Sequence, residues 1–447
     1  MHRLSALLFC CVFGVAQHQP QAGTPAEKPV ELYPGMGIWT HPIGAAGAQA
    51  QKFFDQGLTL LYGFNRYEAL RSFRKVLEID PRAAMAYWGI SMTLGPYVNM
   101  DMEPENHMKE SCEALQQGLK LDPLSASDRA WLEAASSRCP DYSDPSKYVA
   151  AMRALAARYP DDPDAQTLYA EALMLPIRWK WYGSDGKPAA GEFEAEALLE
   201  GVMRRFPNHP GANHLYIHAV ESSPNPERAV ASAQRLMGIV PAAGHMIHMP
   251  AHIWLVMGDY QTAVDVNERA AEADREYFAK TGVIGAYYPY YLHNLQFILY
   301  ARAMQGRAAD TRQAIAAFDE AVQPVAQAMP DMADVFGLYA TMTRWRIGEW
   351  DALLAAPRPK SENPLPQAMW RYSRALALAA GGKKTEARAE QAEFEKNRKA
   401  LDANMPWGTN RLGDVMDLAS AALDARLEVS PPPRRPNGAK PSRYRTL

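Results

Sequence analysis

A pattern of small, large and helix-ending residues near the start of the chain constrains the fold more than any other feature. A unit of about 34 residues is marked by Gly57, Leu60, Ala69, Phe73 and Pro81. The small residues Gly57 and Ala69 allow two helices to approach closely, and the larger side chains fill the space between them. Because proline cannot continue a helix, Pro81 ends the second one. The pattern predicts pairs of antiparallel helices.

The pattern recurs along the chain. It is kept between residues 244 and 289 and returns more weakly from Asp334 and from Ala368. A second repeat relates Arg158–Pro163 to Arg205–Pro210, which share an order of residue types. Recurring units of this length are typical of arrays in which each unit packs against its neighbours.

These spacings resemble those of the tetratricopeptide repeat (TPR) family. The resemblance implies an all-α fold, a right-handed α-solenoid of helix-turn-helix repeats over residues 44–427, without a β-sheet domain. Residues 412–427 are expected to form a C-terminal capping helix. Two interruptions that contain proline, at 95–107 and 175–191, are expected to be long loops.

The N-terminal segment has the parts of a secretory signal peptide. Arg3 lies in a short polar start, the residues up to Val15 are apolar, and Gly14-Val15-Ala16 is a small-x-small cleavage site. We therefore expect a signal peptide over 1–16 and a periplasmic or secreted product.

Two further features concern the ends of the chain. A lipoprotein anchor at Cys10 or Cys11 is the alternative to cleavage, although Phe9 stands where a small residue is expected. Residues 17–43 would form an N-terminal extension. Residues 428–447 are polar and rich in Pro and Arg, so we expect a disordered tail.

Charge and motif content exclude several classes of function. Lys and Arg number 47 and Asp and Glu 50, so the net charge is −3 and no nucleic-acid surface is indicated. The sequence contains no Gly-rich phosphate loop and no nucleophile elbow. Beyond the N-terminus, no segment has the roughly 18 to 20 consecutive apolar residues that a membrane span needs.

Cleavage of the signal peptide would leave two cysteines, Cys112 and Cys139. An oxidising compartment favours a disulfide between them. The alternative is a pair of buried, unpaired thiols. In either state we expect neither cysteine to be catalytic or to bind metal.

Histidines gather in one part of the chain, where seven of the 11 lie between residues 209 and 293. His214 and His218 are four residues apart, as are His248 and His252, so each pair lies on one face of a helix. Neutral imidazole is the commonest metal-ligating side chain, and two histidines at this spacing can bind one ion. The clustering predicts a metal site.

The TPR resemblance implies where these side chains point. In that family the second, fifth and ninth residues of each unit's first helix face the concave groove. Successive units begin at Pro210, Gly244 and Leu292. The histidines that this register assigns to the groove, and that we predict as metal ligands, are His214, His218, His245, His248, His252 and His293.

Two carboxylates accompany the predicted ligands. Glu221 follows His218 by one helical turn, and the second repeat places Glu171 at the position that corresponds to His218. A metal ion lowers the pKa of bound water to about 7, and either carboxylate would then serve as the catalytic general base.

Two elements, Tyr216–Glu221 and Gly244–His252, resemble those of exported bacterial repeat proteins with Tyr-x-His-Ala-x-Glu and Gly-His-x-x-His-Met-Pro-x-His sequences. The resemblance supports export and the treatment of these residues as one unit, and implies no reaction. Pro250 leaves two geometries open. The helix is either kinked there, or it begins near Pro250 with His245 and His248 in a preceding loop.

Two aromatic runs flank the predicted ligands. Trp179 and Trp181 lie on the loop that follows Glu171, and Tyr288 and Tyr291 precede His293. These four aromatic residues are predicted to wall a substrate pocket over the metal. The alternative is that each run packs its segment onto the solenoid.

The metal and the function follow from the ligand types. Imidazole suits Zn, Fe and Cu alike, and a carboxylate among the histidines favours Zn or Fe. The number of ligands allows two ions. We predict a metal-dependent hydrolase or oxidase that acts on a small molecule or peptide in the concave groove. The alternative is a non-catalytic TPR scaffold that binds a peptide or a partner protein there.

Overall fold

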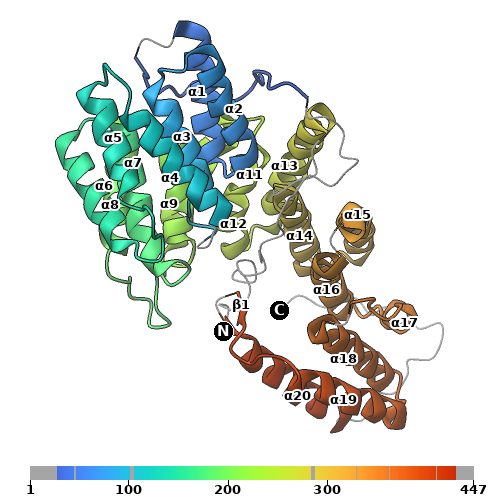
Figure 1. Ribbon diagram of the computed structural model, residues 1–447. Helices are drawn as coiled ribbons and strands as arrows, with labels where there is room; N and C mark the ends of the chain where they lie inside the picture. Colours follow the sequence, from blue (N-terminus) through green and yellow to red (C-terminus); the bar gives the residue numbers. More distant parts are fainter. Residues whose placement is uncertain are drawn as a thin grey trace. The chain divides into compact units, whose positions relative to one another are not determined.

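The computed structural model describes residues 28–44, 47–100, 105–282, 287–328, 330–361, 363–408 and 410–428. Within these ranges the chain is almost entirely α-helical (Figure 1). The predicted all-α, TPR-like class is therefore confirmed. The predicted signal peptide over 1–16 lies outside the described residues, as does all but the first residue of the predicted tail.

The chain forms two compact units, and the first contains the residues up to Pro324 together with residues 407–409. Most of its helices are antiparallel neighbours that follow one another along the chain (Figure 1). Two short 3-10 turns, Leu175–Ile177 and Pro226–Ala229, interrupt the series. The helices of this unit are α1 (Gly47–Tyr62), α2 (Arg66–Ile79), α3 (Ala84–Leu94), α4 (Glu105–Leu119), α5 (Ala126–Ser136), α6 (Ser146–Arg158), α7 (Pro163–Met174), α8 (Glu192–Arg205), α9 (Pro210–Glu221), α10 (Val230–Ile239), α11 (Gly244–His248), α12 (Pro250–Val256), α13 (Tyr260–Thr281), α14 (Tyr288–Met304) and most of α15 (Ala308–Ala328).

The second unit contains Val325–Pro406 and the residues from Asn410. A short two-stranded ladder, β1 (Pro406–Trp407) and β2 (Asn410–Arg411), precedes its last helix. The helices are α16 (Pro330–Ile347), α17 (Trp350–Ala355), α18 (Pro364–Ala380), α19 (Lys384–Lys399) and α20 (Leu412–Glu428). The helix α20 occupies the residues that the sequence assigns to a capping helix.

Phe73 on α2 shows why small residues recur in the first repeat. Its side chain is fully buried. A side-chain carbon added at Gly57 on α1 would lie 2.8 Å from the Phe73 ring, and one added at Gly89 on α3 would lie 2.5 Å from it. One ring thus fills the space among three helices, and close packing leaves no room for a larger residue at either glycine.

The segment before α1 is pinned to the first unit by hydrogen bonds and not by helix formation. The Tyr33 backbone N–H donates to the Gln56 side chain at 2.8 Å. The Gln51 side chain donates to the His41 carbonyl at 2.8 Å. The Trp39 indole donates to Asp164 on α7 at 3.1 Å. The described part of the predicted N-terminal extension therefore packs on the repeats.

The chain bends at Pro250, and the bend keeps both neighbouring histidines helical. The helix α11 ends at His248, and α12 begins at Pro250. The Met249 backbone N–H donates to the His245 carbonyl at 3.0 Å, so the turn before the proline remains closed. Of the two geometries left open by the sequence, the kinked one is present.

Segments distant in sequence meet over α9, α11 and α14. The Tyr62 carbonyl at the end of α1 accepts a hydrogen bond from His214 on α9, 152 residues away. The hydroxyls of Tyr97 and Tyr290 are 3.0 Å apart across 193 residues. The face that the repeat register assigns to a concave groove is therefore covered by earlier parts of the chain.

Two further findings concern the covalent framework and the helices. Cys112 and Cys139 form a disulfide with an S–S distance of 2.09 Å, which is the paired alternative. Among the described helices, none combines the length and the hydropathy that crossing a lipid bilayer requires.

Candidate metal centre

Six buried histidines from four helices form two groups of three. In each group the ring nitrogens, one from each residue, lie within 4.8 Å of one another. The exposed fraction of the six residues ranges from 0% to 8%. We call His214, His218 and His245 the first triad, and His248, His252 and His293 the second triad.

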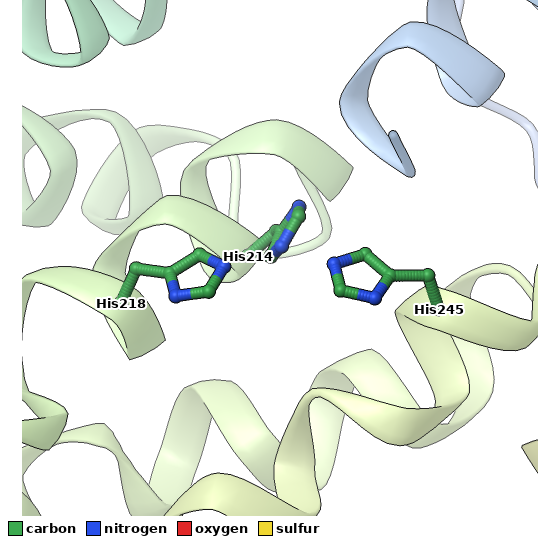
Figure 2. Close-up of side chains that lie close together, drawn as sticks. All are labelled: His214, His218 and His245. Atoms are coloured by element: carbon green, nitrogen blue, oxygen red, sulfur yellow. The ribbon is translucent and has the colours of Figure 1, made fainter. Parts of the chain in front are cut away.

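The two triads share their helices. The first triad takes two histidines from α9 and one from α11, and Figure 2 shows the three rings converging on one space. The second triad takes one histidine each from α11, α12 and α14. The i, i+4 pairs of the sequence therefore stay together, and each gains a third ring from a neighbouring helix.

In three of these rings Nδ1, which we call the outer nitrogen, donates to an acceptor with a fixed position. His214 Nδ1 lies 2.5 Å from the Tyr62 carbonyl oxygen. His248 Nδ1 lies 2.6 Å from Asn267 Oδ1, and His293 Nδ1 lies 3.0 Å from Gln296 Oε1. Since these oxygens accept, Nδ1 carries the proton and Nε2 is left with its lone pair.

Asn267 itself is held in one orientation. Its amide nitrogen donates to the Ala263 carbonyl at 2.6 Å. The amide oxygen therefore faces His248 and can only accept. Acceptors that fix the tautomer and the direction of an imidazole are typical of the residues behind metal ligands.

One carboxylate binds a histidine from each triad. Glu221 Oε1 lies 2.9 Å from His218 Nδ1, and Glu221 Oε2 lies 2.5 Å from His252 Nδ1. Glu221 thus lies behind both rings, on their outer nitrogens. Its two oxygens are engaged with imidazole N–H groups, which orient the rings so that Nε2 points inward.

Several of the Nε2 atoms, which we call the inner nitrogens, have no hydrogen-bond partner. Nε2 of His214 and of His218 and both ring nitrogens of His245 are buried without a hydrogen-bond partner. His248 Nε2 and His252 Nε2 are 2.9 Å apart. When both rings are neutral and carry the proton on Nδ1, the two Nε2 lone pairs repel each other unless a cation lies between them.

Burial favours the neutral form of five of the six rings. Burial lowers the pKa of His218, and it lowers the pKa of His214, His245, His248 and His293 well below the usual value, with neighbouring imidazoles acting in the same direction. Burial opposes the charge on Glu221, but His252 and His218 outweigh it and hold the pKa of that carboxyl well below its usual range. Neutral imidazole is the form that binds metal.

Aromatic rings cover both triads. Phe64 lies 4.5 Å from His214 and 5.2 Å from His245, measured between ring centroids. Tyr290 lies 4.7 Å from His245. The Phe297 ring is 4.7 to 4.8 Å from all three rings of the second triad.

Backbone strain accompanies this cover. In the described part of the chain, Phe64 and Trp179 are the two non-glycine residues with positive φ, 58° and 61°. Both rings contact the first triad, and the Trp179 centroid is 5.7 Å from that of His218. A non-glycine residue in this region costs on the order of 1–3 kcal/mol, and such strain concentrates at functional sites.

Glu171 does not join the triads. Burial raises its pKa, and the nearby charges that lower it are those of Arg138, Arg66 and Arg178. It lines a narrow cavity together with Arg66 and Phe64. Of the two predicted carboxylates, only Glu221 contacts the histidines.

Of the four aromatic residues predicted to wall a substrate pocket, the two tryptophans lie near the first triad and the two tyrosines do not. Trp181 is buried, and its ring centroid lies 6.2 Å from that of His218. Tyr288 and Tyr291 instead pack against Phe278, at 5.1 Å and 5.9 Å. Because α14 is continuous from Tyr288, these two rings point to a different face from Tyr290, which contacts His245.

The sequence interpretation gave no role to several residues of the centre. Gln296 follows His293 by three positions, as Glu221 follows His218, so an i, i+3 acceptor was a usable signal. Tyr62 contributes a backbone oxygen, and Phe64 and Asn267 come from distant turns and helices. No local pattern in the sequence distinguishes these three.

A second histidine cluster surrounds Asp164. Its carboxylate accepts from the Tyr62 hydroxyl at 2.6 Å, from the Trp39 indole at 3.1 Å, and lies 3.2 Å from His209 Nε2 and 2.9 Å from His41 Nδ1. Burial opposes its charge, but the hydrogen bonds from His209 and His41 hold the pKa of Asp164 well below its usual range. We call these five residues the Asp164 cluster.

No family model and no curated relative matches this sequence. Similar solved structures include a human IFIT1 dimer with PPP-AAAA, at 13% identity over 84% of this chain and 89% of that chain, with a TM-score of 0.37. Yeast Tom70 is 10% identical over 84% of this chain and 88% of that chain, with a TM-score of 0.31.

The APC/C hetero-tetramer Cut9–Hcn1 is 12% identical over 85% of this chain and 76% of that chain, with a TM-score of 0.30. By its own helices, the chain is an all-α protein with a TPR-like fold.

Proposed function

We propose that this chain is a metalloprotein whose TPR-like scaffold binds a transition metal through the histidines of the triads. One observation carries the proposal: outer nitrogens are held on fixed acceptors, so that the buried inner nitrogens converge without partners. Leaving a buried polar atom unpaired costs about 1–3 kcal/mol. A bound cation would remove that cost at several rings at once.

The ligand set favours copper or zinc. Glu221 binds the outer nitrogens, so the donors that face inward are imidazoles alone. The preference for Zn or Fe, which depended on a carboxylate among the ligands, therefore no longer applies. Imidazole suits both Cu and Zn, and copper has the highest affinity among divalent first-row ions.

The reaction type follows from the coordination number. Three protein ligands leave at least one open position, which is typical of catalytic rather than structural sites. Water or dioxygen would occupy that position, in accord with the predicted hydrolase or oxidase classes. Glu221 is better suited to orienting ligands than to general-base catalysis, because imidazoles already engage both of its oxygens.

Export remains part of the proposal. The apolar segment before Ala16 supports a periplasmic or secreted protein. The disulfide between Cys112 and Cys139 supports an oxidising compartment. Fractionation of cells that express the full chain tests this directly, because a cytoplasmic product with free thiols would contradict it.

Elemental analysis tests metal binding. The full chain, purified without chelators after growth with added copper or zinc, should contain near-stoichiometric metal. The double variant His214→Ala/His248→Ala disables both triads and should contain none. His107→Ala on α4, outside the triads, is the control and should retain the metal. Metal-free wild-type protein that also shows no thermal shift with Cu, Zn, Fe, Mn or Ni would overturn the proposal.

Partner binding is the second candidate function. The observation that favours it is an open groove of about 440 Å³ on α7 and α8, lined in part by Leu198, Val202 and Phe206. A peptide or protein bound there would be independent of the triads. In that case Leu198→Asp, at a partly exposed position of the groove, would abolish partner capture in a pull-down, and His214→Ala/His248→Ala would not.

A further inference from the structure

We propose that the two triads form one binuclear centre, in which two like ions face each other and share a small anionic ligand. The inference rests on the proposed function and adds to it the number of ions, their coupling and the class of exogenous ligand. Three features carry it: the closeness of the triads, the carboxylate that binds one ring of each, and the charge of the ligand set.

The triads are close enough for their ions to interact. The ring centroids of His245 and His248, one from each triad, are 5.7 Å apart, and those of His218 and His252 are 5.8 Å apart. An ion lies about 2.0–2.1 Å from each ligating nitrogen. Rings this close can therefore hold ions at the separation of about 3.5–4 Å that is typical of two-metal sites.

The connection between the triads is rigid. His245 and His248 lie three residues apart on α11, so one helical turn fixes the spacing of a ligand from each triad. Glu221 binds His218 of the first triad and His252 of the second. An ion bound to one of these two rings would make the N–H of that ring a stronger donor to Glu221. Because the same carboxylate accepts from the other ring, ion binding at one triad would change the hydrogen bond at the other.

Charge defines the shared ligand. Six neutral imidazoles leave the charge of two divalent ions uncompensated, and Glu221 supplies one negative charge behind the rings. A buried charge that is not compensated is costly, so the centre has to attract an anion. Because Phe64, Tyr290 and Phe297 cover the rings, the ligand that we propose is a small one, such as hydroxide, azide or reduced dioxygen.

Copper loading of the full chain tests the proposal by stoichiometry and by magnetism. We expect two Cu(II) per chain by elemental analysis. Because the ions share a ligand, their spins should couple, and the EPR intensity should fall well below that expected from the copper content. Added azide should bind once per pair of ions and give a new charge-transfer absorption.

Variants that disable one triad provide the contrast. His214→Ala removes a first-triad ligand, and His293→Ala removes a second-triad ligand. Each variant should bind one Cu(II) per chain with its full EPR intensity and should bind azide at least tenfold more weakly. Circular dichroism of the apo forms verifies that both variants fold.

Glu221→Gln tests the coupling residue. Loss of a residue behind metal ligands typically lowers metal affinity about 10–100-fold, and here the loss should appear at both triads. Gln296→Ala removes the acceptor of one second-triad ring and should weaken only one ion. Glu200→Gln, whose carboxylate binds Tyr216 and Arg228 outside the centre, is the matched control and should change neither ion.

The outcomes separate the two proposals. Two ions with coupled spins support the binuclear centre. Two ions with full, uncoupled EPR intensity, or a single ion per chain, would overturn it and leave the proposed metalloprotein intact. Absence of copper and zinc binding would overturn both.

Discussion

The Asp164 cluster and the two triads are both buried and rich in histidine, yet they satisfy their polar atoms in opposite ways. In the Asp164 cluster, one carboxylate accepts from an indole, a phenol and two imidazoles. In the triads, the acceptors lie on the outer nitrogens, and inner nitrogens of His214, His218 and His245 have no partner. The first arrangement is complete as it stands, whereas the second leaves buried nitrogens that the proposed cation would satisfy.

This difference distinguishes buried histidines with a structural role from candidate metal ligands. His209 lies five residues before His214 on the same segment, and its two ring nitrogens face the Ala212 backbone N–H and Asp164. It is therefore a structural residue that also caps α9. Proximity in sequence does not separate the two roles, but the partners of each ring nitrogen do.

The largest expected effect is on the Asp164 cluster. Asp164→Ala leaves several buried donors without an acceptor and should destabilise the protein by about 3–5 kcal/mol. Urea unfolding measures this. Asp161→Ala, which removes an exposed carboxylate paired with Arg205, should change the free energy of unfolding by less than about 1 kcal/mol. Similar free energies of unfolding for the two variants would show that the buried Asp164 cluster contributes no more to stability than an exposed ion pair.

Metal should stabilise the triads and not the Asp164 cluster. Copper or zinc at 100 times its Kd should raise the free energy of unfolding by about 2.7 kcal/mol for each occupied site. The increase should persist in Asp161→Ala and disappear in His214→Ala/His293→Ala. Thermal or urea unfolding with and without metal measures it, and an equal increase in the double variant would contradict the assignment of ligands.

Asp274, whose carboxyl accepts from the Tyr287 hydroxyl beside His245, should make the free energy of unfolding depend on pH. Burial raises the pKa of Asp274 to about 8, while hydrogen bonds from Tyr287 and Asn294 act against the rise. The unfolded carboxyl ionises near about pH 4. Stability contributed by the neutral form is therefore complete below about pH 4 and is lost as pH rises towards about 8.

Asp274→Asn should flatten this part of the stability profile. Between pH 5 and pH 7 the wild-type apo protein should lose about 1 kcal/mol per pH unit from this group, and the variant should lose less. The Tyr287 hydroxyl accepts from the His245 backbone N–H, so the neutral replacement should also preserve α11. An unchanged slope in urea unfolding at the two pH values would show that Asp274 is ionised in the folded protein.

The smallest expected effect is at His245. Its ring is buried and both nitrogens lack partners, so His245→Leu should change the stability of the metal-free protein by no more than about 1 kcal/mol. The same variant should lose the ion of the first triad. A loss of several kcal/mol without metal would mean that His245 is a hydrogen-bonded core residue of the kind found in the Asp164 cluster.

The sequence was sufficient for the repeat fold because helix packing depends on local periodicity. Gly57 and Phe73 mark the contact between two helices directly, and the structure has that contact. The i, i+4 spacing likewise keeps His214 with His218, since a helix face is a local property. His248 and His252 also stay together, although they lie on either side of the break at Pro250. Glu171 shows the limit: it occupies the predicted register position and yet faces arginines on other segments.

By itself, then, the sequence determined that this protein is a helical repeat array with histidines on the first helices of successive units. Only the tertiary structure decided how six of them divide into two triads, that Glu221 lies behind both, and that Phe64 and Tyr290 cover them. The reason is that the direction of a side chain along a helix is fixed by a few residues, whereas the partner of a ring nitrogen is chosen by segments up to 152 residues away.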